Sequence, residues 1–332
     1  SNGRVGMSGV SYLAISQDRV AATRPPHLAA INPSEGISDI YREAIAPGGI
    51  LETQFAGHFG SLLGFGLGRV EDVVSEVFEH PLLDEFWQTK SPDLSRIEVP
   101  TFLVASVGNQ GLHVRGTLEA FKRISSDQKW LDVHGRKEWR YYYMPENMDR
   151  QRAFFDHFLK GLDTDLSSWP RVRVEYRDRA NSGPIREEVD WPIPRTRYTE
   201  WFLDAGSARL VATPPDSEQT ASYDPTAAGL PAEAGDQLAT FDLRFEQETD
   251  LAGHAALRLW VASPGAENMD LFVNLDKLDA EGRRIGFPFF AYLDDGPLAQ
   301  GWLRASRREL DSERSTPAQP IQAHQRDIPL PG

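Results

Sequence analysis

The 332-residue chain contains no cysteine, and this absence excludes several kinds of site. Disulfide bridges, zinc–thiolate centres and a cysteine nucleophile all require the thiol. No apolar run approaches the roughly 18–20 residues that a membrane-spanning helix needs, so we expect no membrane partner. Positive charge is scarce as well, because 35 Lys and Arg residues oppose 49 Asp and Glu residues for a formal net charge of −14. Since nucleic-acid affinity depends mainly on neutralising phosphates, we expect no nucleic-acid partner either.

What is present is an ordinary globular composition, with 40% hydrophobic and 25% charged residues. Single hydrophobic cores rarely grow beyond about 250–300 residues, so the length predicts two domains. The chain begins at Ser1 directly before a motif and ends at Gly332 in an extended stretch. We interpret it as an internal segment of a longer protein, in which a targeting signal cannot be judged. A cytoplasmic location is the default expectation.

The first half alternates short apolar strands with helical patterns, which is typical of a mainly parallel sheet covered by helices. Between about residues 38 and 94 the strand rhythm is lost, and helical patterns and a glycine-rich stretch from Gly57 to Gly68 replace it. Such an insertion predicts a helical cap above the sheet. The predicted strands are 4–7, 28–31, 100–105 and 129–133, and the predicted helices are about 11–22, a helix after 111 with Leu118, Phe121 and Ile124 on its buried face, and 149–161.

The second half has a different character, because its apolar residues alternate with a period of two between turns rich in Pro, Gly and Asp. This pattern predicts an antiparallel β-sandwich or jelly roll over residues 166–332, after an α/β domain over residues 1–165. A polar stretch from about 214 to 236 predicts a long surface loop. The alternating segments are 171–176, 255–261 and 271–275.

A serine lies where the first predicted strand gives way to a helix, in the sequence Gly9-Val10-Ser11-Tyr12-Leu13-Ala14. A Gly-x-Ser at this point places the Ser11 hydroxyl on a tight, strained turn above the edge of the sheet. Gly9 is needed because a side chain there would collide with the turn. The backbone N–H of Tyr12 then points to where an oxyanion would form. The alternative interpretation is that Ser11 only caps the helix.

A hydroxyl nucleophile needs a base, and in this arrangement the chain order is nucleophile, acid and histidine, each after a strand. His134 directly follows the strand at 129–133, so it is the predicted general base. His113, just past the turn at 108–111, is expected to line the pocket. The remaining histidines lie in loops, in the cap, in a helix or in the β-rich half: His27, His58, His80, His157, His254 and His324.

The acid should follow the strand at 101–107, but the residue in that turn is Asn109. An amide oxygen can hold an imidazole, but it carries no charge to stabilise an imidazolium, and the amide nitrogen can favour the wrong tautomer. Three interpretations stay open: a weakened triad, a carboxylate recruited from elsewhere, and a chain that has lost catalysis. Asp132 is close to His134 in sequence, but we expect it not to reach the ring. We retain Asn109 as the predicted acid position.

Together these residues resemble the cocaine-esterase-like and X-prolyl dipeptidyl-peptidase family of serine hydrolases (CocE/NonD type). The motif around Ser11 is similar to the family's Gly-x-Ser-Tyr-x-Gly/Ala, and the similar segments 111–121, 154–161 and 256–263 extend the resemblance over almost the whole chain. It implies an α/β-hydrolase core, incomplete at its N-terminal side, with a helical cap at about 38–94. It also implies that the β-rich half is a jelly-roll domain without its last strands.

The resemblance implies Ser11 as nucleophile, His134 as general base and the Tyr12 N–H as oxyanion donor, with Asn109 in the place of the family's Asp. The implied reaction is acyl transfer from a small-molecule ester, amide or peptide substrate, with no metal and no cofactor. Phe86 and Trp87 are candidates for the acyl pocket, with core packing as the alternative.

Two further alternatives stay open. Within hydrolases, an esterase is not distinguished from an X-prolyl dipeptidase, and a homo-oligomer is not distinguished from a monomer. Outside them, Asn109 favours a noncatalytic α/β-hydrolase-like protein that binds a ligand or partner.

Overall fold

The computed structural model describes residues 2–55, 71–224, 238–290 and 293–330. The chain divides into two compact units, Ser1–Pro194 with His254–Gly332, and Arg195–Gly253. This division differs from the boundary expected near residue 166. The glycine-rich stretch Gly57–Gly68 and residues 225–236 of the expected surface loop lie outside the described residues.

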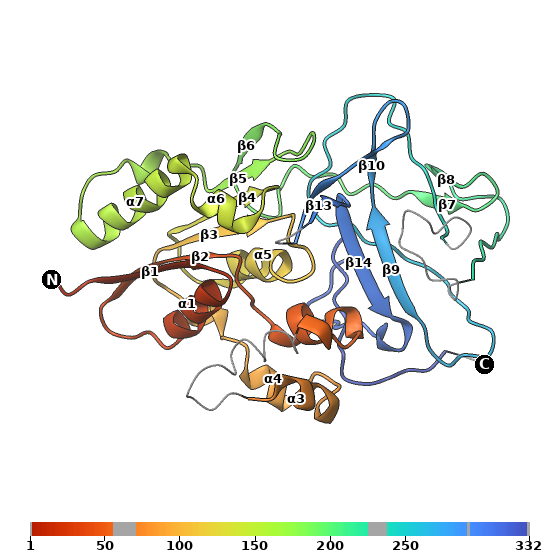
Figure 1. Cartoon of the computed structure of the whole chain (residues 1–332), viewed down its shortest axis with the longest axis horizontal. Helices are drawn as coiled ribbons and strands as arrows, with labels where there is room; N and C mark the ends of the chain where they lie inside the picture. The colour runs from red at the N-terminus through yellow and green to blue at the C-terminus, as the bar shows by residue number, and fades with distance from the viewer. Residues whose placement is uncertain (1, 56–70, 225–237, 291–292, 331–332) are drawn as a thin grey trace. The chain divides into compact units, whose positions relative to one another are not determined.

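Six strands of the described residues form one sheet in sequence order, from β1 to β6 (Figure 1). The pairs from β1 to β5 are parallel, and β6 runs antiparallel to β5. The structure corrects the placement of 171–176 in the β-rich half, because β5 continues the main sheet. An alternating pattern predicts a half-buried strand but not the sheet that it joins. The strands are β1 Val5–Val10, β2 Leu28–Ser34, β3 Thr101–Ser106, β4 Lys129–His134, β5 Val172–Glu175 and β6 Ile185–Glu188.

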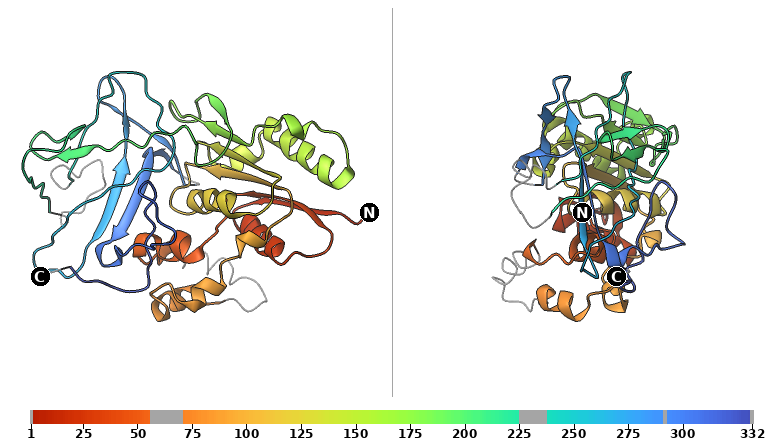
Figure 2. Two further views of the ribbon diagram at one scale, coloured as in Figure 1. Left: turned by 180° about the vertical axis from the view of Figure 1, so that it is seen from behind. Right: turned by 90° about the vertical axis from the view of Figure 1, so that its right-hand side faces the viewer.

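Helices cover both faces of this sheet, α1 and α5 on one and α6 and α7 on the other (Figures 1 and 2). The predicted helices are confirmed within a few residues. The last one begins before Asp149, because Pro145 fits the first helical position, and it ends at Gly161 with a left-handed φ of 71°. The bounds are α1 Tyr12–Ala22, α5 Val114–Arg123, α6 Glu138–Tyr142 and α7 Pro145–Lys160.

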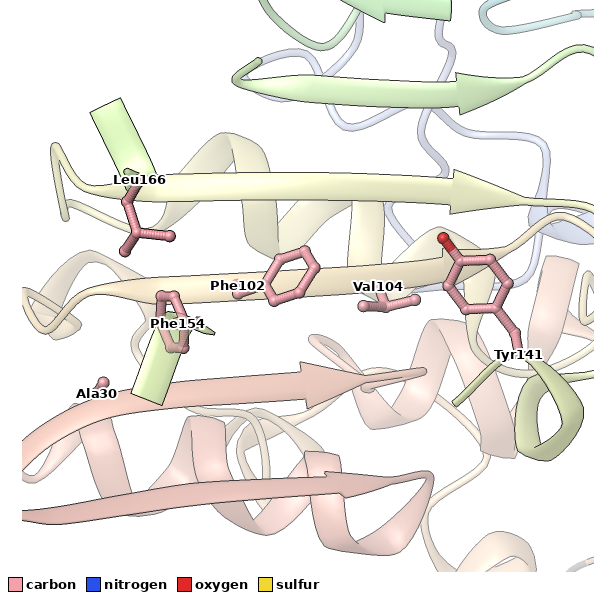
Figure 3. Packing of buried hydrophobic residues seen from close by; sticks show 6 residues of the cluster. All are labelled: Ala30, Phe102, Val104, Tyr141, Phe154 and Leu166. Atoms are coloured by element: carbon pink, nitrogen blue, oxygen red, sulfur yellow. The ribbon is translucent and has the colours of Figure 1, made fainter. Parts of the chain in front are cut away.

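An aromatic core lies between the sheet and α7 (Figure 3). Phe154 is fully buried, and its ring centroid lies 5.9 Å from Phe102 of β3, 6.0 Å from Trp130 of β4 and 5.0 Å from Phe158 on the same helix. Tilted and edge-to-face ring pairs of this kind add to the stabilisation from burial alone. This packing holds α7 against the strands that carry the candidate site.

The described residues of the insertion between β2 and β3 contain short helices joined by turns and irregular segments, and no strand. Its buried side chains form a second hydrophobic cluster around Tyr41, Ile45, Val77 and Trp87. The elements are the π-helix η1 Tyr41–Ile45, the 3-10 turns η2 Pro47–Gly49 and η3 Leu94–Arg96, and the helices α3 Val73–Glu79 and α4 Glu85–Thr89.

Antiparallel strand pairs follow the main sheet. The predicted strand at 271–275 is confirmed as β9, which pairs with β14. The prediction at 255–261 is wrong, because no strand of the described residues pairs with this segment, and Trp260 is 91% exposed there. Two short 3-10 turns are η4 Leu166–Ser168 and η7 Ala305–Arg307. The strands in Ser1–Pro194 with His254–Gly332 are β9 Asp270–Leu275, β10 Lys277–Leu278, β11 Arg284–Ile285, β12 Phe287–Phe289, β13 Leu293–Gly296 and β14 Ala299–Arg304; the other unit contains β7 Phe202–Asp204 and β8 Arg209–Val211.

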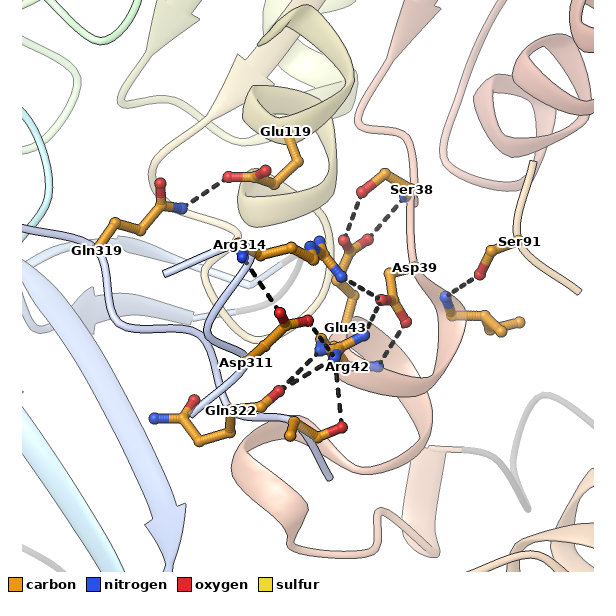
Figure 4. A network of polar contacts seen from close by, with 12 residues as sticks. Ser38, Asp39, Arg42, Glu43, Ser91, Glu119, Asp311, Arg314, Gln319 and Gln322 are labelled. Carbon is orange, nitrogen blue, oxygen red and sulfur yellow. Dashed lines mark hydrogen bonds and ion pairs between the residues drawn. The ribbon is translucent and has the colours of Figure 1, made fainter. Parts of the chain in front are cut away.

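A buried polar network joins the first turn of the cap to the C-terminal segment (Figure 4). Arg42 forms an ion pair with Asp39 at 2.6 Å and donates to the carbonyl oxygens of Gln322 and Ala323. Arg314 lies 3.5 Å from the same Asp39 carboxylate. Separating the partners of a buried ion pair would leave an uncompensated charge, which is unfavourable. The network therefore holds the start of the cap against the C-terminal segment.

Candidate active site

Ser11 lies on a strained turn between β1 and α1. Its φ of 61° and ψ of −120° are unusual for a residue with a side chain, and its N–H donates to the Ser34 carbonyl oxygen at 3.0 Å. A Cβ on Gly9, which has a φ of 158°, would lie 2.5 Å from the Leu13 Cβ. The Ser11 side chain makes no capping hydrogen bond with α1. The geometry therefore supports a half-buried hydroxyl on an elbow more than a helix cap.

The buried side-chain amide of Gln17 on α1 stabilises the turn that carries Ser11. Gln17 is fully buried; its Nε2 donates to the Leu13 carbonyl oxygen at 2.9 Å, and its Oε1 accepts from the Asn32 N–H at 3.0 Å. These bonds tie the first turn of α1 to β2. The hydroxyl of Ser11 is thus carried by a helix whose position relative to the sheet is fixed.

His113 is the imidazole that contacts Ser11. Its Nε2 lies 3.1 Å from the Ser11 Oγ, and its Nδ1 lies 3.3 Å from the carbonyl oxygen of Gly36. Because a carbonyl oxygen only accepts, this contact assigns the ring proton to Nδ1 and leaves the Nε2 lone pair facing the hydroxyl. Burial lowers the pKa of His113 to about 4, against a smaller opposing effect of the Gly36 bond. The ring is therefore neutral near pH 7.

His134 ends β4, but its ring is engaged elsewhere. Its Nδ1 accepts from the Arg136 N–H at 3.2 Å, so the ring proton is on Nε2, which lies 3.7 Å from a Glu35 carboxylate oxygen. The ring stacks on Tyr141 with centroids 3.6 Å apart, and burial lowers the pKa of His134 to about 3. Among the hydrogen bonds of the described residues, His134 has none with Ser11. Its role as general base stays a prediction that this geometry does not favour.

Glu35 is a buried carboxyl that the sequence analysis did not single out. It follows β2 directly, has a φ of 62°, and neither of its side-chain oxygens makes a hydrogen bond of good geometry in the described residues. Burial, and then the neighbouring Glu138 carboxylate, raise the pKa of Glu35 well above its usual value. A buried carboxyl on a non-glycine residue in this backbone region is typical of functional sites. The predicted strand ends at residue 31, so the position of Glu35 at the end of β2 was not visible in the sequence pattern.

The side-chain amide of Asn109 contacts the Glu138 carboxylate rather than an imidazole. The Asn109 Nδ2 donates to the Glu138 Oε2 at 2.6 Å, while the Asn109 Oδ1 has no hydrogen-bond partner in the part of the chain that is described. Burial raises the pKa of Glu138, and the Asn109 bond partly opposes this. The Asn109 side chain is thus buried at the predicted edge of the sheet and makes no hydrogen bond to an imidazole of the described residues, while its backbone carbonyl oxygen accepts from the His113 N–H at 3.2 Å.

Asp132 is engaged in a separate ionic cluster. Its carboxylate lies 3.2 Å from an Arg150 nitrogen and 3.1 Å from an Arg173 nitrogen, and it accepts from the Tyr141 hydroxyl at 3.2 Å. Two guanidinium groups satisfy the charge. As expected, Asp132 makes no hydrogen bond to the His134 ring in the described residues.

The remaining predicted site residues lie in two places. Tyr12 is the first residue of α1, so its N–H is at the positive end of the helix next to Ser11. Trp87 is 1% exposed, donates to the His80 carbonyl oxygen at 2.7 Å and belongs to the hydrophobic cluster of the cap, against which Phe86 also packs. In the structure, Phe86 and Trp87 therefore take part in hydrophobic packing, which is the alternative to an acyl-pocket role given in the sequence analysis.

A possible metal-binding group lies in the cap, away from Ser11 in the chain. Among the described residues, Glu76, Glu79 and His80 form the group of His and acidic side chains whose ligand atoms lie within 4.8 Å of one another. The Nδ1 of His80 is already bound by Asp84 at 2.5 Å. We assign no ion to this group, since exposed acidic groups of this kind are common without one. Among the described residues, none of the helices combines the length and apolar character needed to cross a bilayer.

Two protein families match this chain. Residues 166–332 match the family described as the X-Pro dipeptidyl-peptidase C-terminal non-catalytic domain, and residues 1–65 match the X-Pro dipeptidyl-peptidase S15 family. Cocaine esterase from Rhodococcus sp. (strain MB1 Bresler) is 27% identical over 271 residues, which cover 64% of this chain and 46% of that protein. The chain thus spans about half the length of this curated relative.

Solved structures are similar over the whole chain. A CocE/NonD family hydrolase from Staphylococcus aureus is 40% identical with a TM-score of 0.93, over 99% of this chain and 59% of that one. An aminopeptidase from a marine sediment Thaumarchaeota archaeon has a TM-score of 0.63 at 16% identity, over 99% of this chain and 65% of that one. The predicted fold class, an α/β-hydrolase core with a helical cap followed by a β-sandwich, is confirmed by these matches together with the parallel sheet and the later antiparallel strands.

Proposed function

Because the chain belongs to the CocE/NonD family of hydrolases, we propose that it is a serine hydrolase that forms an acyl-enzyme on Ser11. The observation that carries this proposal is the 3.1 Å contact between the Ser11 Oγ, on its strained elbow, and the His113 Nε2. A nucleophilic hydroxyl within hydrogen-bond reach of a neutral imidazole is the arrangement that acyl transfer requires.

In the proposed mechanism, the Ser11 oxygen attacks the carbonyl carbon of the substrate while its proton passes to the His113 Nε2. The carbonyl oxygen becomes an oxyanion, which the Tyr12 N–H at the start of α1 stabilises. When the bond to the leaving group breaks, His113 returns the proton to that group. Water then attacks the acyl-enzyme with His113 again as base, and release of the acid regenerates Ser11.

The choice of His113 over His134 as the base depends on which ring nitrogen carries the proton. His113 has its proton on Nδ1, held by the Gly36 carbonyl oxygen, and its free lone pair faces Ser11. His134 has its proton on Nε2, and its Nδ1 already accepts from a backbone N–H. A backbone carbonyl oxygen also avoids the wrong tautomer that an asparagine side chain can favour, although it carries no charge to stabilise the imidazolium. Turnover slower than that of a carboxylate-based triad follows from this.

The substrate class that fits this chemistry is an ester or amide of a small acyl group. Esterase and peptidase names both occur among the similar proteins, namely cocaine esterase and an archaeal aminopeptidase. The same Ser11 and His113 geometry serves both bonds, since both reactions pass through a tetrahedral intermediate at a carbonyl carbon.

The test of the proposed function is covalent labelling of the full chain with a fluorophosphonate probe, which reacts with activated serine hydroxyls. We expect labelling of the wild type and of Ser16→Ala, and none of Ser11→Ala, as measured by intact mass. Ser16 is the matched control, because its hydroxyl lies on the same helix and donates to the Leu13 carbonyl oxygen at 3.0 Å. A folded wild type that stays unlabelled would contradict the proposal and favour a noncatalytic binding protein.

The pH dependence of hydrolysis is expected to reflect the buried state of His113. Burial disfavours the imidazolium and lowers the pKa of His113 to about 4, so the neutral, basic form persists well below pH 6. We expect kcat/KM for a neutral p-nitrophenyl ester to stay level from pH 8 to about 5.5 and to fall by half near pH 4, since this profile reports the free enzyme. Short exposures after a pH jump keep unfolding from contributing. A half-maximal rate near pH 6.5 would instead indicate a solvated base.

A further inference from the structure

The backbone of Gly36 contacts the imidazole of His113, so the position of the imidazole depends on how these two residues are held together. Gly36 lies in the segment after β2, and His113 lies one residue before α5. The carbonyl oxygen of Gly36 accepts from the His113 Nδ1 at 3.3 Å. This is a long bond to an uncharged acceptor, and it cannot by itself hold the ring in one place.

The hydroxyl of Thr117, on the first turn of α5, bridges the same two residues. It accepts from the Gly36 N–H at 2.9 Å and donates to the His113 carbonyl oxygen at 3.1 Å. The three hydrogen bonds form a closed cycle from Gly36 through Thr117 to His113 and back to Gly36. A threonine hydroxyl that donates to the carbonyl oxygen four residues earlier is common in helices. The Thr117 hydroxyl also accepts a hydrogen bond from a separate segment of the chain, which is not part of that common pattern.

The cycle of hydrogen bonds is buried and closely packed. Thr117 is 1% exposed and His113 is 2% exposed, so bulk water has no access to these hydrogen bonds. At the preceding position of α5, a Cβ added to Gly116 would lie 2.8 Å from the Ser38 nitrogen, so the helix and the segment after β2 are in close contact. This close contact restricts movement of α5 relative to the segment that contains Gly36.

We propose that Thr117 is a positioning residue, whose hydroxyl couples Gly36 to His113 and thereby aims the His113 Nε2 at the Ser11 Oγ. The proposal rests on the proposed function in assigning His113 as the base. Loss of the hydroxyl leaves the Gly36 N–H buried without an acceptor, and the segment that orients His113 then shifts. A shift of about 1 Å in a catalytic group can lower turnover by about 100-fold.

The experiment compares three variants of the full chain. Thr117→Val keeps the shape and removes the hydroxyl, Thr117→Ser keeps the hydroxyl, and Thr101→Val is the matched control. Thr101 is also fully buried and donates to a backbone carbonyl oxygen, that of Val99, but it begins β3 at the far end of the strand from the site. Each variant is assayed for kcat and KM with a p-nitrophenyl ester, and the His113 Nδ1–H is observed by 15N-edited NMR, assigned by its loss in His113→Ala.

We expect Thr117→Val to lower kcat by about 10- to 100-fold with KM changed less than about threefold, and to broaden or shift the Nδ1–H signal. Thr117→Ser and Thr101→Val should stay within about threefold of the wild type with the signal unchanged. If Thr117→Val does not fold, Thr117→Ala takes its place with the same expectation.

Two results overturn the proposal: a Thr117→Val kcat and signal like those of the wild type, or equal losses in Thr117→Val and Thr117→Ser, which would show a packing effect. If the wild type itself is inactive, the proposed function fails, while the Nδ1–H signal still decides whether Thr117 positions the ring.

Discussion

Replacement of His113 by alanine is expected to lower kcat/KM for a p-nitrophenyl ester by about 10⁴-fold or more, with KM little changed. The physical reason is that the 3.1 Å contact with the Ser11 Oγ supplies the acceptor for the hydroxyl proton, and removal of the base from a serine hydrolase abolishes most of its rate enhancement. Added imidazole should restore part of the rate, because the truncated side chain leaves a space of that shape. The measurement is steady-state kinetics of the full chain.

His134→Gln is the matched variant for this prediction. Both histidines are buried at the carboxyl end of the sheet, with exposures of 2% for His113 and 1% for His134. Because the His134 nitrogens face Arg136 and Glu35, we expect its replacement to lower kcat/KM by less than about tenfold in folded protein. The opposite order, with His134→Gln the more damaging change, would return the role of base to His134 and contradict the assignment made from the ring tautomers.

Phe154→Ala is expected to have the largest effect on stability, a loss of about 3–5 kcal/mol in the free energy of unfolding. The ring of Phe154 is fully buried and contacts Phe102, Trp130 and Phe158 across the interface of α7 with the sheet. Truncation removes the transfer free energy of the ring and leaves a cavity that three other aromatic side chains cannot close. Urea denaturation followed by tryptophan fluorescence measures the change.

Phe78→Ala serves as the control for this prediction. Phe78 has the same side chain but is 64% exposed on α3, so its removal from water contributes little to folding. We expect a change within about 0.5 kcal/mol. Equal effects at the two positions would mean that the aromatic cluster around α7 is not the core of the sheet domain.

The periodic patterns predicted most of the α/β half because each of its elements is determined locally. The apolar run of β3 and the four-residue spacing of Phe154 and Phe158 indicate a strand and a helix without knowledge of their neighbours. Pairing is not local. The same alternation occurs in β5, which adds to the main sheet, and at 255–261, which pairs with no described strand. A period of two reveals a strand's faces but not its partner.

The candidate site was only partly predictable for the same reason. Ser11 was found because its strain comes from neighbours in the sequence, Gly9 before it and a helix after it. His113 was expected only to line the pocket, since its orientation depends on Gly36, which lies 77 residues away in the chain. His134 has the expected place after a strand, but the backbone N–H of Arg136 determines its tautomer. Chain order indicated candidates, and hydrogen-bond partners distinguished between them.

The separation of β2 and β3 in the chain has a consequence for how such a protein diversifies. Ile31 and Thr101 pair directly in the sheet, although the whole cap lies between them in sequence. The entropy of closing a loop rises only with the logarithm of its length, by about 0.6 kcal/mol for each doubling. Evolution can therefore lengthen, shorten or replace this insertion at small thermodynamic cost. The strands that carry the reactive groups need not change.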